Sequence, residues 1–182
     1  GRQRSSPLRR SGSSLTPGRV DWRRSPCVRS PVMAVHYERK SYQTKAHMGM
    51  IDVSGDFQHA VDEAVRAHGV SHGTITGFTT GGVAGLTTLE FEPGIVNHDL
   101  KAAFDVFSPY KDETGGVIHY RHHETWHDDN GSSHIKAALL SPFITVPFID
   151  GRLTLGPWQN LTLVECDTRD REREIVFMVT AQ

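Results

Sequence analysis

Apolar residues recur with two different periods along this chain, and each period predicts a different kind of element. Between residues 54 and 69 they lie three and four positions apart, which indicates a helix with one buried face. That face carries Phe57, Ala60, Val61, Ala64 and Val65. Ser54 and Asp56 are of the types that cap helix N-termini, and Gly69 is expected to end the helix because glycine accepts a left-handed backbone.

Strands are predicted where polar and apolar residues alternate, or where short apolar runs lie between turn residues. The expected strands are residues 36–45, 48–53, 74–79, 84–91, 143–149, 152–155, 160–167 and 173–180. The last of them alternates most clearly, with Ile175, Phe177 and Val179 on one face. Gly81-Gly82 is predicted to be a turn, and Asp150-Gly151 a hairpin turn.

A second helix is predicted between Pro93 and Pro109. Proline favours the first turn of a helix, Glu92 before it is a weaker cap, and Pro109 is expected to stop the helix. Its expected buried face carries Ile95, Val96, Leu100, Ala103, Phe104 and Phe107.

The stretch after this helix is polar, and we expect residues 110–133 to be mostly loop. A short helix over residues 134–140 is predicted to follow, capped by Ser132 or Ser133 and closed before Pro142. Many strands with two or three helices predict an α+β fold, an antiparallel sheet or sandwich covered by helices.

Charge is divided unevenly along the chain and sets residues 1–32 apart. This leader has eight arginines and one acid, a net charge of +7, so residues 33–182 carry −8. Because it has few apolar residues, we expect a disordered leader outside a single domain that spans residues 33–182. An organellar transit segment and a weak nucleic-acid arm are the other interpretations. The acidic domain disfavours nucleic acid as a partner.

Two further features narrow the class of protein. No apolar run reaches the roughly 18–20 residues of a membrane span, so we expect no membrane partner. Cys27 and Cys166 are too few for a disulfide framework and favour a reducing compartment. The expected location is therefore cytoplasmic, or organellar if the leader is a transit segment.

Histidines are concentrated in one stretch. Five of the eleven lie between positions 119 and 134, namely His119, His122, His123, His127 and His134. Asp128, Asp129 and Asn130 share the stretch. Imidazole and carboxylate together bind zinc-like ions, and imidazole is the usual acid–base group near neutral pH. A hydrated surface loop that is rich in histidine explains the composition equally well.

Several other residues are candidates for chemistry, each with a plainer interpretation. Lys136 lies near the start of the short helix, where free N–H groups suit phosphate, although a single lysine is more often solvated. Glu90 and Glu92 point the same way in a strand and form a two-carboxylate patch, or a solvated face. Trp158 suits a core or an interface, and Gln159 could satisfy backbone groups.

Three separated motifs resemble the YjbQ family, which is also called the secondary thiamine-phosphate synthase family. They are Y-R-H at 120–122, N-G-S-S-H-I-K-A-A-L-L at 130–140 and P-F-I-D-G-R-L-T-L-G-P-W-Q at 147–159. The run T-T-L-E-F-E-P-G at 87–94 resembles one branch of the family. The match covers about residues 35–182.

The resemblance implies an α+β fold, a homotrimer, and a pocket near the subunit boundary that holds a divalent metal such as zinc, or phosphate. His122 and His134 stand at family histidines and, with His127, are the expected metal ligands. Many members carry a third histidine where this chain has Gly81, so His127 or Glu90 is expected to complete the site.

The remaining motif positions have expected roles of two kinds. Asn130, Lys136, Trp158 and Gln159 are expected to bind phosphate or substrate. Glu90, His127 and Asp128 are the catalytic candidates.

The activity implied is a weak joining of hydroxymethylpyrimidine pyrophosphate to thiazole phosphate, with a small phosphorylated metabolite as the partner. The alternative is a non-catalytic trimer that binds a phosphorylated metabolite or a metal. A nucleic-acid role through the leader is the third hypothesis.

Overall fold

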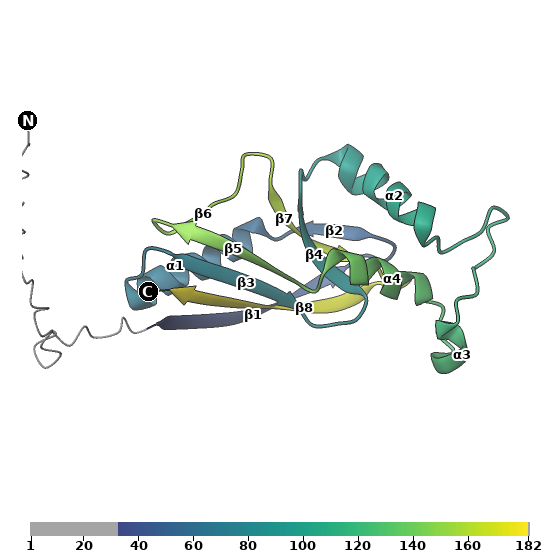
Figure 1. Ribbon diagram of the computed structural model, residues 1–182, viewed down its shortest axis with the longest axis horizontal. Helices are drawn as coiled ribbons and strands as arrows, with labels where there is room; N and C mark the ends of the chain where they lie inside the picture. Colours follow the sequence, from purple (N-terminus) through teal and green to yellow (C-terminus); the bar gives the residue numbers. More distant parts are fainter. Residues whose placement is uncertain (1–32, 182) are drawn as a thin grey trace, which may run out of the picture. The chain divides into compact units, whose positions relative to one another are not determined.

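The computed structural model describes residues 33–181, and the expectations for the leader lie outside them. The larger sheet has five strands in the order β1 (Ala34–Thr44), β8 (Arg171–Ala181), β3 (Gly73–Thr79), β5 (Phe143–Ile149) and β6 (Arg152–Leu153). The smaller sheet has the order β2 (Gly49–Asp52), β7 (Asn160–Glu165) and β4 (Ala84–Leu89). All neighbouring strands are antiparallel (Figure 1), which confirms the predicted α+β class.

Helix α1 (Ser54–His68) packs on the inner face of the larger sheet, as its periodicity predicts. Phe57 and Phe177 are fully buried and meet edge to face, with ring centroids 5.0 Å apart. Edge-to-face packing suits the quadrupoles of aromatic rings. Leu161 and Leu163 of β7 join the same core, so this cluster ties both sheets to α1.

The predicted end of α1 is confirmed and its predicted caps are wrong. Gly69 follows the helix with φ 67°, the left-handed conformation that favours glycine. Ser54 instead accepts a hydrogen bond from the N–H of Leu161, and Asp56 accepts hydrogen bonds from Tyr42 and Lys40. Both side chains therefore fix α1 to strands, and the N–H of Ser54 donates instead to the carboxylate of Asp52.

Strand β7 is covered on both faces, which explains its continuous apolar run. Its other face, with Val164 and the adjacent Cys166, contacts two further helices, α2 (Leu100–Phe107) and α4 (Gly131–Leu140). Leu100 and Phe104 of α2 and Leu140 of α4 pack against this smaller cluster.

The second predicted helix exists, but its predicted buried face is only partly covered. It opens with a π-helical turn, η2 (Ile95–Asp99), which continues into α2, and Glu92 accepts hydrogen bonds from the N–H groups of Gly94 and Ile95. No residue of η2 or α2 is fully buried, and Phe107 is 53 % exposed. Leu100 and Phe104 of the predicted face pack against the smaller cluster, whereas Ala103 and Phe107 are exposed.

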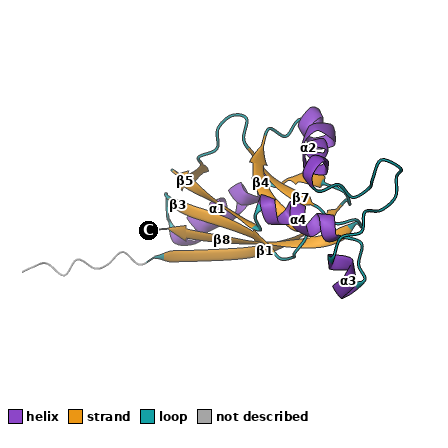
Figure 2. Ribbon diagram, turned by 45° about the vertical axis from the view of Figure 1, so that its right-hand side comes forward, coloured by secondary structure: helices purple, strands orange, loops and turns teal. Residues whose placement is uncertain are grey.

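Residues 110–133 are mostly loop, as predicted, whereas the predicted start of the next helix is wrong. A short helix, α3 (His122–Trp126), lies within the expected loop (Figure 2). Helix α4 begins at Gly131 rather than at residue 134, because the N–H groups of Ser133 and His134 already donate to the Asn130 carbonyl. Ser132 and Ser133 therefore lie inside the first turn, where both are buried. Among the described residues, no helix is long and apolar enough to cross a membrane.

Candidate functional site

Two histidines meet where α3 and α4 converge. His122 is the first residue of α3, and His134 lies in the first turn of α4. Gly131 permits the approach, because a Cβ there would lie 2.4 Å from the Tyr120 Cβ and 3.2 Å from the His122 Cβ. The two imidazole rings lie with centroids 4.5 Å apart and planes inclined at 45°. We call them the histidine pair.

The surroundings of the histidine pair favour a neutral His134. Partial burial, followed by the nearby His122, lowers the pKa of His134. The carboxylates of Asp167 and Asp128 and a hydrogen bond with the Gly82 backbone act in the opposite direction. A neutral imidazole is the form that accepts a proton or binds a metal.

The other three histidines of the stretch form a separate group. The ring of His123 lies between those of His119 and His127, with centroids 5.2 Å and 6.1 Å away. His119 also faces Glu124, with 3.5 Å between the ring nitrogen and the carboxylate. The ring neighbour of His127 is therefore His123, and not a member of the histidine pair.

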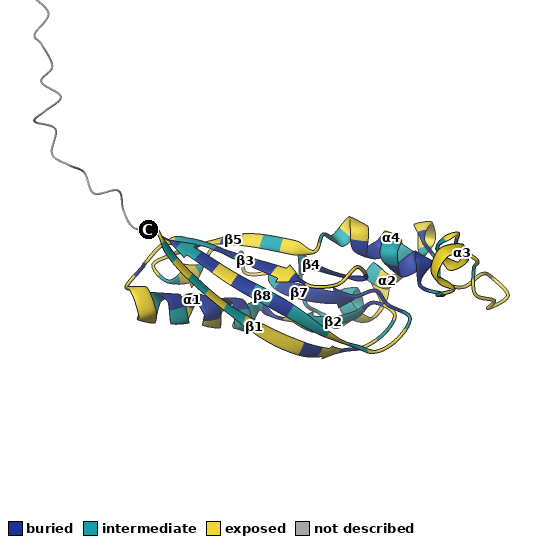
Figure 3. Cartoon of the chain, turned by 90° about the horizontal axis from the view of Figure 1, so that it is seen from below, coloured by how far each residue is buried: buried dark blue, intermediate teal, exposed yellow. Residues whose placement is uncertain are grey.

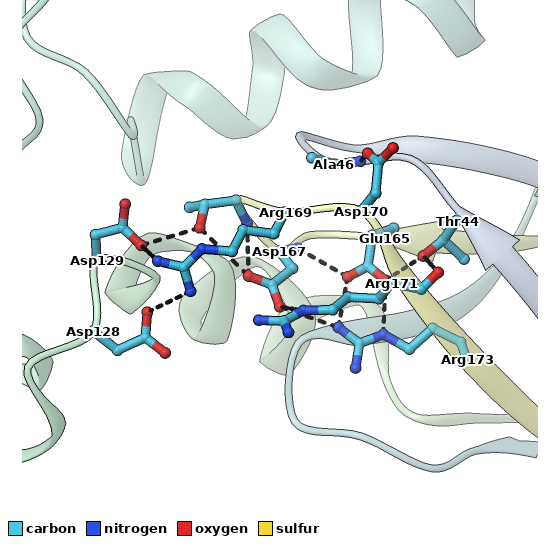
Figure 4. A network of polar contacts seen from close by, with 11 residues as sticks. Thr44, Ala46, Asp128, Asp129, Glu165, Asp167, Arg169, Asp170, Arg171 and Arg173 are labelled. Carbon is cyan, nitrogen blue, oxygen red and sulfur yellow. Dashed lines mark hydrogen bonds and ion pairs between the residues drawn. The ribbon is translucent and has the colours of Figure 1, made fainter.

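Acidic residues near the histidine pair are held by arginines (Figure 4). Asp128 lies 3.6 Å from Arg169, and Asp129 lies 3.3 Å from the same guanidinium. Asp129 also accepts a hydrogen bond of 2.8 Å from the Tyr110 hydroxyl, which lowers the pKa of its carboxyl. Asp128 keeps one buried oxygen, Oδ1, without a hydrogen bond. The catalytic candidate Asp128 is thus an ion-pair partner of Arg169 that lies beside the histidine pair.

The same network continues into the sheets. Arg171 bonds Asp167 at 2.7 Å, and Arg173 makes two hydrogen bonds to Glu165, at 2.7 and 2.9 Å. Glu165 is fully buried and also accepts a hydrogen bond from the Thr44 hydroxyl. Charge-assisted, two-pronged bonds of this kind fix side-chain positions.

The donor set of one chain does not complete a zinc site. Structural and catalytic zinc sites use three or four protein ligands. Within residues 33–181, no group of three or more His, Cys, Asp or Glu side chains is arranged to hold a metal ion. The histidine pair supplies two imidazoles, and neither His127 nor Glu90 completes a set with it.

Three motif residues lie at the other end of the smaller sheet. Glu90 directly follows β4, and the opposite end of that strand, at Ala84, is next to the turn that contacts His134. Five residue steps separate the strand ends, about 17 Å at about 3.3 Å per residue. Trp158 is 70 % exposed in the loop before β7, and Gln159 accepts a hydrogen bond from the Gly156 N–H. Within one chain these residues do not reach the histidine pair.

Lys136 is buried in α4 and does not join the histidine pair, whereas Asn130 is buried directly before α4 and its carbonyl accepts a hydrogen bond from the N–H of His134. Side chains two positions apart in an α-helix point about 200° away from each other around the helix axis, so Lys136 and His134 leave α4 on nearly opposite sides. Lys136 lines a cavity with His47, Lys101 and Lys111. His47, Lys101 and Lys111 lie on separate elements and belong to no motif, so no pattern in the sequence identifies them. Figure 3 shows the buried positions along α4.

Comparison with known proteins identifies the family. The profile described as "UPF0047 protein YjbQ-like" matches residues 38–182. The chain belongs to the YjbQ-like family. A UPF0047 protein of Synechocystis is 32% identical over 127 residues, which cover 70% of this chain and 82% of the relative. A UPF0047 protein of Mycobacterium bovis is 30% identical over 131 residues, 69% of this chain and 95% of the relative.

Solved structures agree with this YjbQ-like fold. A YbjQ-like protein of unknown function from Sulfolobus solfataricus matches with a TM-score of 0.70 and 23% identity, over 82% of this chain and 99% of that one. An uncharacterised YjbQ/UPF0047 protein from Clostridium acetobutylicum matches with a TM-score of 0.62 and 29% identity, over 76% and 97%. The resemblance stated from the motifs is therefore confirmed at the level of family and fold.

Proposed function

We propose that the histidine pair binds the phosphate or pyrophosphate group of a small metabolite. The observation that carries the proposal is the meeting of two imidazoles, from two separate helices, with centroids 4.5 Å apart. His134 is favoured in its neutral form, and the ring of His122 lies against it. Such a pair offers one proton acceptor and one donor to a bound phosphate ester.

The finer proposal is a transferase. The family resemblance supports joining hydroxymethylpyrimidine pyrophosphate to thiazole phosphate, with pyrophosphate as the leaving group. This reaction requires that the pyrimidine and thiazole rings be held together and the departing pyrophosphate neutralised, which depends on placement more than on reactive side chains. A zinc ion on the histidine pair would need at least one further ligand from another copy of the chain or from solvent.

The second candidate is a binding protein without catalysis. It is favoured by the distance of the candidate Glu90 from the pair, and by the ion pair that occupies Asp128. The two candidates share the ligand and differ only in turnover.

The test compares the parent protein with the double variant His122→Ala, His134→Ala. Replacement of both rings is expected to weaken pyrophosphate binding at least tenfold in isothermal calorimetry, about 1.4 kcal/mol. The matched control is His119→Ala, His123→Ala, which removes two imidazoles of the second group and is expected to bind like the parent. Equal binding by the parent and the His122/His134 variant would refute the proposal.

Turnover separates the two candidates. Formation of thiamine phosphate from the two substrates by the parent, lost in the double variant, would support the transferase. Binding without product would support the binding protein. Metal analysis on protein purified without an affinity tag tests whether zinc is bound. A zinc content below one ion per three chains would refute a zinc site.

We also propose that the chain assembles as a homotrimer. Support comes from apolar side chains on the outer face of the larger sheet, where Phe78 pairs with Phe143 and Tyr37 with Met178. Phe143 is 52 % exposed and Tyr37 66 % exposed. Light scattering is expected to give three times the 20.3 kDa chain mass, and a single-chain mass would overturn the proposal.

A further inference from the structure

A cavity of about 230 Å³ lies on the side of α4 away from His134. Its walls come from α2, from the first turns of α4, and from the turns that carry His47 and Thr168. Binding pockets for drug-sized ligands have volumes of roughly 300–1,000 Å³, so this cavity suits a smaller ligand.

Positive charge dominates the cavity wall. Three lysines line it, Lys101, Lys111 and Lys136, against one carboxylate, Asp105. Asp105 is the ion-pair partner of the buried Lys136. Within residues 33–181, Lys101 and Lys111 have no carboxylate within ion-pair distance, so two positive charges face the cavity unneutralised.

All three lysines lie close enough to the His47 ring to lower its pKa. Partial burial lowers the pKa of His47, and the charges of Lys101, Lys136 and Lys111 lower it further, in that order. Asp105 alone acts in the opposite direction. A cationic cleft with low-dielectric walls raises the local concentration of anions.

A buried hydroxyl without a partner lies in the same wall. Ser133 is 1 % exposed, lines the cavity, and its Oγ has no hydrogen-bond partner. A buried polar group left unpaired costs free energy, and such a group commonly has a ligand or water as its partner. Ser133 also lies in the first turn of α4, where the helix dipole favours negative charge.

We propose that this cavity is a phosphate-binding site, distinct from the histidine pair, for inorganic phosphate or the phosphate group of a small metabolite. Lys101 and Lys111 supply charge, and the Ser133 hydroxyl donates a hydrogen bond to a phosphate oxygen. The proposal does not rest on the proposed function of the histidine pair, because the two sites lie on nearly opposite sides of α4.

The test is a titration of the full chain with inorganic phosphate, followed by amide NMR and calorimetry. The amide signals of Ser132, Ser133 and Lys136 are expected to shift. The double variant Lys101→Met, Lys111→Met is expected to bind phosphate at least tenfold more weakly. Both lysines are exposed, so the fold is expected to survive, which thermal unfolding checks.

Two controls make the result decisive. Arg66→Met removes one positive charge from the exposed end of α1, and this variant is expected to bind phosphate like the parent. Asp105→Asn removes the opposing carboxylate and is expected to tighten binding, a gain that a damaged fold would not produce. Unchanged affinity in the double-lysine variant, or an equal loss in Arg66→Met, would overturn the site.

The variant His122→Ala, His134→Ala separates this site from the histidine pair. It is expected to keep the phosphate-induced shifts of Ser132 and Ser133. Loss of those shifts would show one shared site and would overturn the claim of a distinct one.

Discussion

The sheet core, which lies between α1 and the two sheets, differs from the α2–α4 region, residues 100–140, in the side chains that dominate its interior. Between α1 and the sheets, large fully buried residues such as Phe57, Phe148 and Phe177 are apolar. In the α2–α4 region, the buried residues include Asn130, Ser133 and other polar ones, and Asn130 Oδ1 and Ser133 Oγ lack partners. Polar atoms without partners occur in the strands too, at His36 Nε2 and Thr79 Oγ1, but Ser133 Oγ lies in the wall of a cavity, where a ligand would satisfy it.

The largest expected effect is in the sheet core. Phe57→Ala should lower the free energy of unfolding by about 3–5 kcal/mol, because the ring is fully buried against Phe177 and leaves a cavity. Denaturant unfolding followed by circular dichroism measures it. Phe107→Ala, at the exposed end of α2, is the matched control and should cost far less. Equal losses would contradict the division between the two regions.

A buried charge in the core should give the next largest effect. Glu165→Gln keeps the volume but removes the charge that accepts two hydrogen bonds from Arg173. The expected loss is about 1.5–3 kcal/mol, the range for hydrogen bonds to charged groups. Glu172→Gln, an exposed acid on the same strand as Arg173, should change stability little. A loss below that of Glu172→Gln would show that this ion pair does not hold the sheets together.

Much of the sheet core follows from local pattern. The 3.6-residue period of α1 and the two-residue period of β8 identify Phe57, Ile175 and Phe177 as core residues, and all three are buried. The caps of α1 were mispredicted because Ser54 and Asp56 bond distant strands, which no local pattern reveals.

The α2–α4 region was harder to predict, for two physical reasons. The apolar face of α2 was expected to be buried, but a helical period does not say which element covers it. The histidine stretch identified His122 and His134, yet sequence spacing did not separate them from His127 or Lys136. Lys101 and His47 join Lys136 only through tertiary packing, so their cavity carries no sequence signal.

Two buried serines sharpen the comparison within the α2–α4 region. Ser108 donates a hydrogen bond to the Ser132 carbonyl, whereas Ser133 Oγ has no partner. Ser108→Ala should therefore cost about 1 kcal/mol, and Ser133→Ala should cost nothing measurable or stabilise the protein. Thermal unfolding without phosphate measures both. A larger loss for Ser133→Ala would mean that its hydroxyl already has a partner in the free protein.

The smallest expected effect is a change in the titration of one histidine. The positive charge of Lys101 is the largest electrostatic contribution that lowers the pKa of His47 from the ordinary value of 6.5. Lys101→Met should raise this pKa, and burial should still keep it below 6.5. Proton NMR of the imidazole ring follows the titration. Lys45→Met, two residues from His47 but paired with Asp170, is the control and should leave the pKa unchanged.

The lowered pKa of His47 also makes the stability of the protein depend on pH. Because the folded-state pKa of His47 lies below 6.5, the unfolded chain binds more protons in that interval, and stability falls as the pH decreases through it. Lys101→Met should make this fall shallower, since the folded and unfolded pKa values move closer together. Unfolding measured at several pH values below 6.5 tests the slope. A fall as steep in Lys101→Met as in the parent would mean that Lys101 does not face His47 across the cavity, and the proposed phosphate site would then lose one of its two unneutralised charges.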